Sequence, residues 1–285
     1  MRFATLLDGE RATPALVRDR RVLAFNGPGA PFRSLHEVAA SGAGGADGLR
    51  LVEAWADTQP AGAWLPLDEA VLGPAASEPG AIFTIGLNYV VPGEPAEAAP
   101  TRPLVYAKLP SSVSGPGAVV SWDRSLTANV DAEVELGVVI GAPAHAVSPR
   151  EAMRHVFGYT CVNDMSSRDP WLDGDQWLLG KSMAGFCPVG PFVVTPDEMP
   201  PGPLRLGCTV NGAAIQDGST ADLRFPIAEL IAFLSRHVTL QPGDLIATGT
   251  PARLAAPPGP DRHLEPGDRV TAWIEGLGEL TTVIA

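Results

Sequence analysis

Apolar and acidic side chains alternate along residues 130–140. Read with the two-residue period of a β-strand, the apolar side chains fall on one face, and Asp131, Glu133 and Glu135 fall on the other. Neighbouring carboxylates on one strand face repel each other unless solvent screens them or a cation lies between them. The pattern therefore predicts either an edge strand with a solvent-exposed face or a strand that helps to bind a cation.

Helix and turn signals separate further strand-like segments. Ser148 and Glu151 form a capping box, which predicts a connecting helix over residues 148–157. An apolar segment at residues 158–162 then predicts a strand that leads into Asp164. The other predicted elements are helices at residues 34–40 and 226–235 and strands at 1–7, 17–25, 81–85, 104–107, 245–248, 269–275 and 279–284. The fold is therefore predicted to be mainly β with α/β elements.

Glycine and proline are abundant, with 31 and 29 residues, although 45% of the chain is hydrophobic. In a chain this apolar, such an excess indicates many tight turns between strands and not disorder. At 285 residues the chain is long enough for a large domain and a small one. A loose segment rich in glycine, proline and alanine at residues 73–80 predicts a small domain at residues 1–78 and a second one at 79–285.

Net charge and apolar run lengths exclude several classes of partner. A net charge of −12 argues against nucleic acid and anionic membranes. No apolar stretch approaches the ~18 residues of a membrane span, and the first apolar run is too short for a signal peptide. Three cysteines without C-x-x-C spacing indicate neither a disulfide framework nor a zinc site. We therefore expect a cytoplasmic protein with a small-molecule partner.

Lysine is scarce in this chain. Of its 20 basic residues only Lys108 and Lys181 are lysines, and the others are arginines. A compact ammonium with a tunable pKa does chemistry that a planar guanidinium cannot. Chance is the competing explanation for two residues, but both lie in polar motifs, which favours a role in a functional site.

Six motifs follow one another in the last two-thirds of the chain. They are GLNY at 86–89, DAEVELGVVIG at 131–141, GYTCVNDMSSRD at 158–169, GKS at 180–182, CPVGP at 187–191 and PGDLIATGTP at 242–251. Together they resemble the fumarylacetoacetate hydrolase family. The resemblance implies a mixed β-sandwich roll preceded by a small N-terminal domain, in a protein that forms a homodimer.

The resemblance also implies a divalent metal held by Glu133, Glu135 and Asp164. Three carboxylates without histidine or cysteine are a hard, all-oxygen ligand set. Magnesium is therefore the expected metal, with manganese and calcium as alternatives.

The activity implied by the resemblance is hydrolysis of a carbon–carbon bond in a 2-oxo or 2,4-dioxo acid, of the acylpyruvate or fumarylacetoacetate type, through a metal-stabilised enolate. Lys181 is expected near the developing negative charge. The residues expected to bind this small carboxylic acid are Asn88, Tyr89, Lys108, Arg168 and Thr250. A structural role for Arg168, in which it pairs with Asp169 or a sheet end, is a competing interpretation.

Three positions depart from the family pattern. The loop after the LNY motif usually carries a histidine that activates water with a nearby glutamate, but Pro92 stands at that position. Trp171 replaces a common glutamine, and Ala184 replaces a common acidic residue. Water activation by the usual pair is therefore in question.

These departures leave three interpretations of the function. The first is the hydrolase, with Glu94 or Glu97 as a displaced general base on a lid over residues 90–100. The second is a water-independent decarboxylase or keto–enol tautomerase, that is, an isomerase, on a similar 2-oxo acid. The third is a catalytically impaired homologue that binds metal and ligand.

Overall fold

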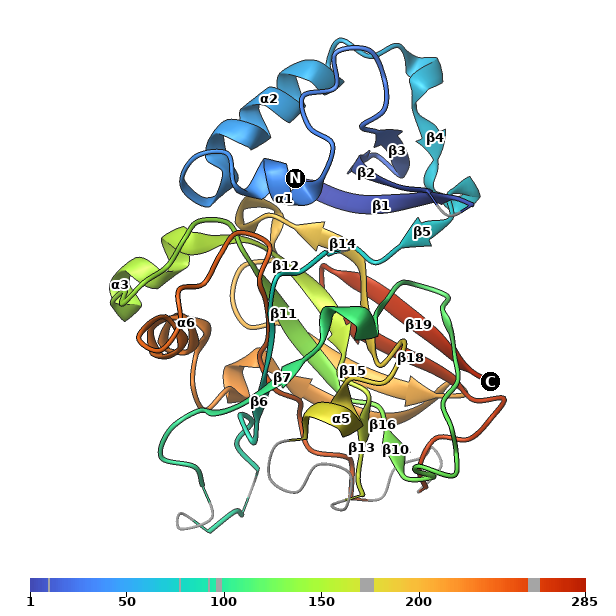
Figure 1. Cartoon of the computed structure of the whole chain (residues 1–285), viewed down its shortest axis with the longest axis vertical. Helices are drawn as coiled ribbons and strands as arrows, with labels where there is room; N and C mark the ends of the chain where they lie inside the picture. The colour runs from blue at the N-terminus through green and yellow to red at the C-terminus, as the bar shows by residue number, and fades with distance from the viewer. Residues whose placement is uncertain (10, 77, 92, 96–98, 170–176, 256–261) are drawn as a thin grey trace.

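A computed structural model describes residues 1–9, 11–76, 78–91, 93–95, 99–169, 177–255 and 262–285. One large mixed sheet runs through the molecule (Figure 1). Its strands are, in spatial order, β4 (Leu65–Pro66), β3 (Arg21–Ala24), β2 (Arg11–Arg18), β1 (Arg2–Asp8), β14 (Cys187–Val194), β12 (Val156–Asn163), β11 (Val134–Ile140), β17 (Leu245–Ala247), β6 (Ile82–Gly86) and β7 (Leu104–Lys108), with β5 (Leu72–Gly73) on β1 and β8 (Val113–Ser114) on β14.

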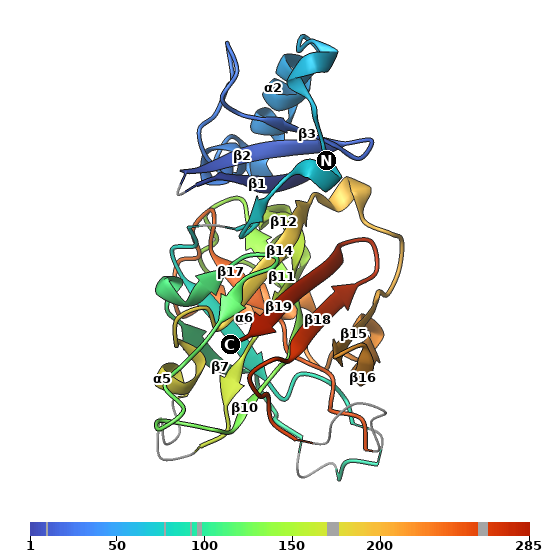
Figure 2. The same cartoon turned by 90° about the vertical axis from the view of Figure 1, so that its right-hand side faces the viewer.

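A second sheet packs beside this one, as the turned view of Figure 2 shows. It contains β16 (Ala213–Ser219), β15 (Arg205–Val210), β18 (Arg269–Ile274), β19 (Gly278–Ile284) and β9 (Val119–Val120). A short two-stranded ladder joins β10 (Val130–Asp131) to β13 (Ser166–Ser167). The α-helices are α1 (Leu35–Ala39), α2 (Ala46–Ala56), α3 (Pro149–Ala152), α5 (Leu178–Lys181) and α6 (Ile227–Ser235). The predicted fold class, mainly β with mixed sheets, is confirmed.

The apolar alternation of β11 divides its side chains between two cores. Val134, Leu136 and Val138 belong to a cluster that also contains residues of β15, β18 and β19. Val139 points the other way, into a cluster that contains Val52 of α2. Burial of both faces fixes β11 in register between β12 and β17.

The predicted strand over residues 130–140 is interrupted. β10 ends at Asp131 and β11 begins at Val134, so Glu133 lies in the break between them. The Glu133 N–H donates to Asn163 Oδ1 at 3.0 Å, and the Asp164 N–H donates to the Glu133 carbonyl at 2.8 Å. The edge-strand interpretation is wrong, because β11 is a central strand on which Glu135 is only 2% exposed.

Most other predicted elements are found. Ser34 caps α1 by accepting from the Glu37 N–H at 3.1 Å. The capping box of Ser148 is present, but α3 is shorter than expected, because a 3₁₀ turn and then β12 follow it. Two turns carry proline and glycine at their central positions, Pro242-Gly243 and Pro266-Gly267. Gly243 has φ +86° and Gly267 has φ +92°, as a type II turn requires.

The N-terminal residues extend the large sheet, because β1 pairs with β14 and Arg2 lies opposite Val194. In Figure 1 the helix α2 and the strands β2 and β3 lie at one end of the molecule. The domain boundary at residue 78 and the homodimer stay predictions. Among the described helices, none has the length and apolar character needed to cross a membrane.

Candidate active site

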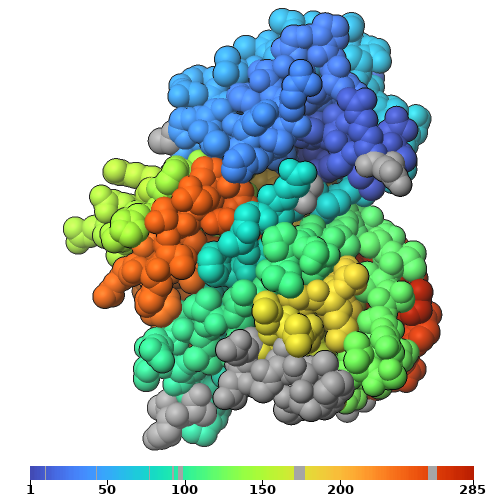
Figure 3. Space-filling view, viewed as in Figure 1, coloured from blue at the N-terminus to red at the C-terminus, as the bar shows by residue number. Residues whose placement is uncertain are grey.

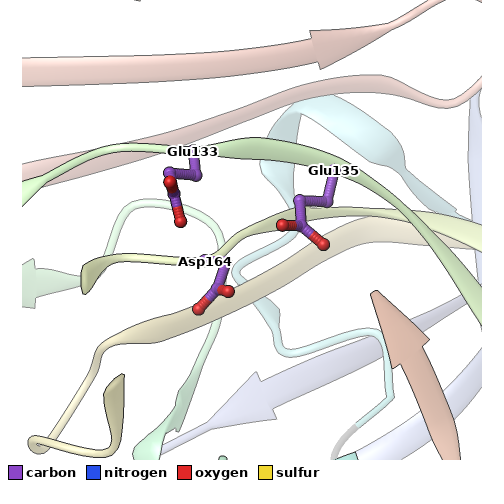
Figure 4. Close-up of side chains that lie close together, drawn as sticks. All are labelled: Glu133, Glu135 and Asp164. Atoms are coloured by element: carbon purple, nitrogen blue, oxygen red, sulfur yellow. The ribbon is translucent and has the colours of Figure 1, made fainter. Parts of the chain in front are cut away.

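Glu133, Glu135 and Asp164 come together as the sequence predicts. Each offers one carboxylate oxygen, and these oxygens lie within 4.8 Å of one another. Figure 4 shows the three carboxylates gathered where β11 begins and β12 ends. Val134 lies opposite Asn163 in the β11–β12 ladder, so the strand register sets the positions of all three. We call these residues the acidic cluster.

The acidic cluster faces a cavity of about 450 Å³. Four further residues that the sequence nominates also line it: Tyr89, Arg168, Lys181 and Thr250. Its more exposed part carries apolar side chains, which we call the apolar rim, namely Leu87, Val91, Tyr106 and Trp177. The same cavity therefore joins a charged end to an apolar one.

Asp164 is fully buried and pairs with both lysines of the chain. Lys108 Nζ lies 2.6 Å from Asp164 Oδ1, and Lys181 Nζ lies 2.5 Å from Asp164 Oδ2. Burial alone would raise the pKa of Asp164, but Lys108 and Lys181 outweigh it and hold this pKa below its ordinary value. Asp164 therefore stays ionised, and the two scarce lysines meet at one carboxylate.

Glu135 has a different environment in the same cluster. Its carboxylate accepts from the Gly249 N–H at 2.8 Å, but within the described part of the chain no cationic side chain lies within 4.0 Å of it. Burial and then repulsion from Asp164 raise the pKa of Glu135 well above its ordinary value. A buried carboxylate without a cationic partner beside two other carboxylates is the arrangement that a divalent cation stabilises. The residues present therefore fit the expected metal.

Lys181 contacts two of the three metal-binding candidates and lines the same cavity. Besides Asp164 it contacts Ser166 Oγ at 2.8 Å and Glu133 Oε2 at 3.4 Å. Burial alone would lower the pKa of Lys181, but the carboxylates of Asp164, Glu133 and Glu135 raise it above its ordinary value. Lys181 is therefore a positive charge that can donate a hydrogen bond.

Arg168 forms ion pairs with Asp131 and Glu133. Its Nε donates to Asp131 Oδ2 at 2.8 Å, and a terminal nitrogen donates to Glu133 Oε1. Asp169 instead accepts from Thr127 Oγ1 and Asn129 Nδ2. The competing interpretation, in which Arg168 pairs with Asp169, is therefore wrong, because Asp169 is already engaged by neighbours that precede β10.

Two nominated substrate-binding residues lie outside the cavity lining. The Asn88 amide is fully buried, donates to the Thr248 carbonyl at 2.7 Å and accepts from the Phe225 N–H at 2.8 Å. In this geometry Asn88 holds three loops together. Lys108 donates to Asp164 Oδ1 at 2.6 Å and to the Met165 carbonyl at 3.0 Å. Tyr89 does face the cavity, and its buried hydroxyl has no hydrogen-bond partner in the described structure.

Glu94, one of the two nominated bases, forms an ion pair. Arg224 donates to its Oε2 at 2.5 Å, and both side chains are mostly buried. Glu94 is absent from the residues that line the cavity. Glu97, Pro92, Trp171 and part of the expected lid lie outside the described residues.

Comparison with known proteins agrees with this geometry. The family described as Fumarylacetoacetate (FAA) hydrolase C-terminal matches residues 81–285. The chain belongs to the fumarylacetoacetate hydrolase family.

Three solved members of this fold illustrate its range. A fumarylacetoacetate hydrolase from psychrophilic Exiguobacterium antarcticum is 31% identical with a TM-score of 0.85, covering 100% of this chain and 99% of its own. A probable 2-hydroxyhepta-2,4-diene-1,7-dioate isomerase from Mycobacterium abscessus is 30% identical with a TM-score of 0.77, covering 100% and 98%. Maleylpyruvate hydrolase from Sphingobium sp. SYK-6, solved with manganese(II) ion and pyruvate, is 27% identical with a TM-score of 0.79, covering 100% and 99%. Similar proteins thus include hydrolases and isomerases.

Sequence reasoning missed several cavity residues of this family member. Gln216 of β16 donates to Thr250 Oγ1 at 2.7 Å and accepts from the Val134 N–H at 3.0 Å, which ties Thr250 to the start of β11. Asp131 positions Arg168, and its Oδ1 also lies 2.7 Å from His263 Nδ1, within hydrogen-bonding distance. No local pattern signals Gln216, because β16 is far from the motifs in sequence.

The apolar rim carries unusual backbone geometry. Leu87 has φ +53° and Trp177 has φ +60°, both in the left-handed region. This region costs a residue with a side chain about 1–2 kcal/mol. Gly86 is needed beside Leu87, since a Cβ there would lie 2.7 Å from the Tyr106 ring. The backbone conformations of Leu87 and Trp177 therefore lower the stability of the fold.

Proposed function

We propose that the chain is a divalent-metal-dependent hydrolase that cleaves a carbon–carbon bond of a 2-oxo or 2,4-dioxo acid of the acylpyruvate or fumarylacetoacetate type. The observation that carries the proposal is Glu135, a buried carboxylate with no cationic side chain within 4.0 Å among the described residues, placed beside Glu133 and Asp164 at the cavity wall. Membership of a family with hydrolase and isomerase members supports an enzyme.

Glu133, Glu135 and Asp164 would hold the cation. When bound, it would act as a Lewis acid for the oxygens of a 2-oxo acid and would stabilise negative charge on them. The relative solved with manganese(II) ion and pyruvate supports this combination of metal and 2-oxo acid. Magnesium fits the same all-oxygen ligand set.

Three side chains would bind and orient the substrate. The Lys181 ammonium can donate to an oxygen that gains negative charge as the carbon–carbon bond breaks. Arg168 faces the cavity and can meet the substrate carboxylate, while Asp131 and Glu133 fix its guanidinium. The Thr250 hydroxyl, held by Gln216, adds a neutral hydrogen-bonding group.

A water-independent reaction is the second candidate, and the Glu94–Arg224 ion pair favours it. Hydrolysis needs a general base, but the Glu94 carboxylate is engaged by Arg224 and does not line the cavity. A decarboxylase or keto–enol tautomerase working on the same enolate needs no activated water. The isomerase from Mycobacterium abscessus gives this candidate a similar fold.

Product analysis separates these functions. The magnesium-loaded protein is incubated with acylpyruvates and with oxaloacetate, while the enol absorbance and the products are followed. The corresponding acid plus pyruvate indicates hydrolysis, carbon dioxide indicates decarboxylation, and loss of enol absorbance without cleavage indicates tautomerisation. If the metal binds and no substrate reacts, the enzyme proposal is wrong and the chain is an impaired homologue.

Single variants then locate the base. Glu94→Gln and Glu97→Gln are compared on the best substrate. A large fall in turnover for one of them, with magnesium affinity unchanged, supports hydrolysis by a displaced base. Unchanged turnover in both supports the water-independent reaction.

A further inference from the structure

The apolar rim bears on which 2-oxo acid the cavity accepts, and this inference rests on the proposed function. Leu87 is 63% exposed and Val91 is 40% exposed, although both line the same cavity as the acidic cluster. Tyr106 and Trp177 add two aromatic rings with centroids 6.4 Å apart. The aliphatic side chains and ring faces of this rim supply apolar surface and no charge.

Two of the rim residues have an uncommon backbone conformation. The described residues with positive φ and a side chain are Asp19, Arg20, Leu87, Ala146, Trp177 and Asn211. Leu87 and Trp177 are the large apolar side chains among them, and both line this cavity. Strain that persists at two positions around one cavity indicates selection for function.

The two ends of the cavity are connected through Arg168. Its guanidinium carbon lies 5.9 Å from the centre of the Trp177 ring, while its nitrogens bind Asp131 and Glu133. A ligand whose carboxylate meets Arg168 would therefore bring its next substituent close to Trp177. A planar apolar substituent matches an indole and a phenol ring better than a charged one does.

We propose that Leu87 and Trp177 are specificity-determining residues, which select 2-oxo acids with a planar, apolar acyl group, such as an aromatic acylpyruvate. The alternative is a substrate whose tail carries a second carboxylate, because Arg253 also lines the cavity. These two substrate classes differ in the tail alone, so ligands with a common head group distinguish them.

The test is calorimetric titration of the magnesium-loaded protein with pyruvate, phenylpyruvate and 2-oxoglutarate. We expect phenylpyruvate to bind about tenfold more tightly than pyruvate and more tightly than 2-oxoglutarate. Leu87→Gly and Trp177→Gly should each remove most of this preference, measured as the ratio of phenylpyruvate affinity to pyruvate affinity in the same variant.

Thermal unfolding gives a second readout that needs no ligand. Leu87→Gly should raise the melting temperature by about 2 °C, since glycine adopts the left-handed region without a clash. Ala146→Gly is the matched control, because Ala146 has φ +50° but does not line the cavity. It should also raise the melting temperature, with no change in the phenylpyruvate preference.

Several results would overturn the inference. They are equal affinities for phenylpyruvate and pyruvate, tighter binding of 2-oxoglutarate, a preference that survives both variants, or no binding of any of the three. If acylpyruvates are not turned over but the preference and its loss are found, the proposed function fails and the inference stands. If acylpyruvates are turned over but the phenylpyruvate preference is absent, the proposed function stands and this inference fails.

Discussion

The acidic cluster and the apolar rim belong to one cavity but are built in different ways. Sheet register fixes the cluster: Val134 pairs with Asn163, and the backbone of Asp164 bonds to Glu133. Of the rim residues, Leu87 and Val91 lie in the loop after β6 and Trp177 lies just before α5, whereas Tyr106 lies on β7; Leu87 and Trp177 have a left-handed backbone. A hydrogen-bonded ladder permits few alternatives, whereas loop geometry can change without loss of the fold. In the proposed function, the metal site would therefore lie on the hydrogen-bonded strands, and most of the residues that select the substrate would lie on loops.

The largest expected effect is on the free energy of unfolding of the protein. Asp164→Asn removes the carboxylate that two buried lysines share, and an uncompensated buried charge costs about 3–5 kcal/mol. Urea denaturation at pH 7 measures this loss. The matched control Asp217→Asn breaks the exposed pair with Arg205 and should cost no more than about 1 kcal/mol.

The same variant has a pH signature. Because the lysines lower the pKa of Asp164, its contribution to stability is present above its ordinary value of 3.8 and is lost as the pH falls below it. The difference between wild type and Asp164→Asn should therefore be full at pH 7 and shrink below about pH 3.8. A difference that is independent of pH would contradict the ion pairs.

The next effect is on turnover. Lys181→Arg keeps the charge but changes its shape and donor geometry, and it should lower kcat about 100-fold. The measurement is kcat on the best substrate, with magnesium affinity determined alongside. Arg50→Lys, on the exposed surface, is the control. Wild-type turnover in Lys181→Arg would contradict a specific role for the Lys181 ammonium in the chemistry.

The smallest effects are expected in the loop after β6. Glu94→Gln and Arg224→Gln should each raise KM by a factor of about 2–5 with little change in kcat, because a mostly buried ion pair holds the loop. The charge-reversed double variant, Glu94→Arg with Arg224→Glu, should recover most of the loss. A large fall in kcat in Glu94→Gln that the double variant does not restore would instead place Glu94 in the chemistry.

The sequence predicted the parts that follow from a repeating pattern. The two-residue alternation around Val134, the capping box of Ser148 and the carboxylates of the cluster are local signals, and the structure contains them. The break at Glu133 was missed because it arises from a side-chain contact with Asn163 on another strand. The partners of Glu94 and Arg168 were missed for the same reason: Arg224 and Asp131 come from segments that local patterns do not connect.

Glu135 tests the central claim, that the cluster is built for a divalent cation. Glutamine in its place can still accept from the Gly249 N–H but carries no charge. Burial raises the pKa of Glu135, so the metal-free wild type should lose stability as the pH rises from the ordinary value of 4.5 through that raised pKa. Glu135→Gln should not show this loss.

The decisive measurement is the melting temperature of wild type and Glu135→Gln at pH 7, with and without magnesium, combined with calorimetric titration of the metal. Without metal, Glu135→Gln should melt about 2–4 °C higher than wild type, because the variant avoids the cost of ionising a buried carboxyl beside Asp164. With magnesium, wild type should gain stability and the variant should not, since its affinity falls at least about tenfold. Unchanged magnesium affinity in Glu135→Gln, or a lower melting temperature without metal, would contradict the metal site.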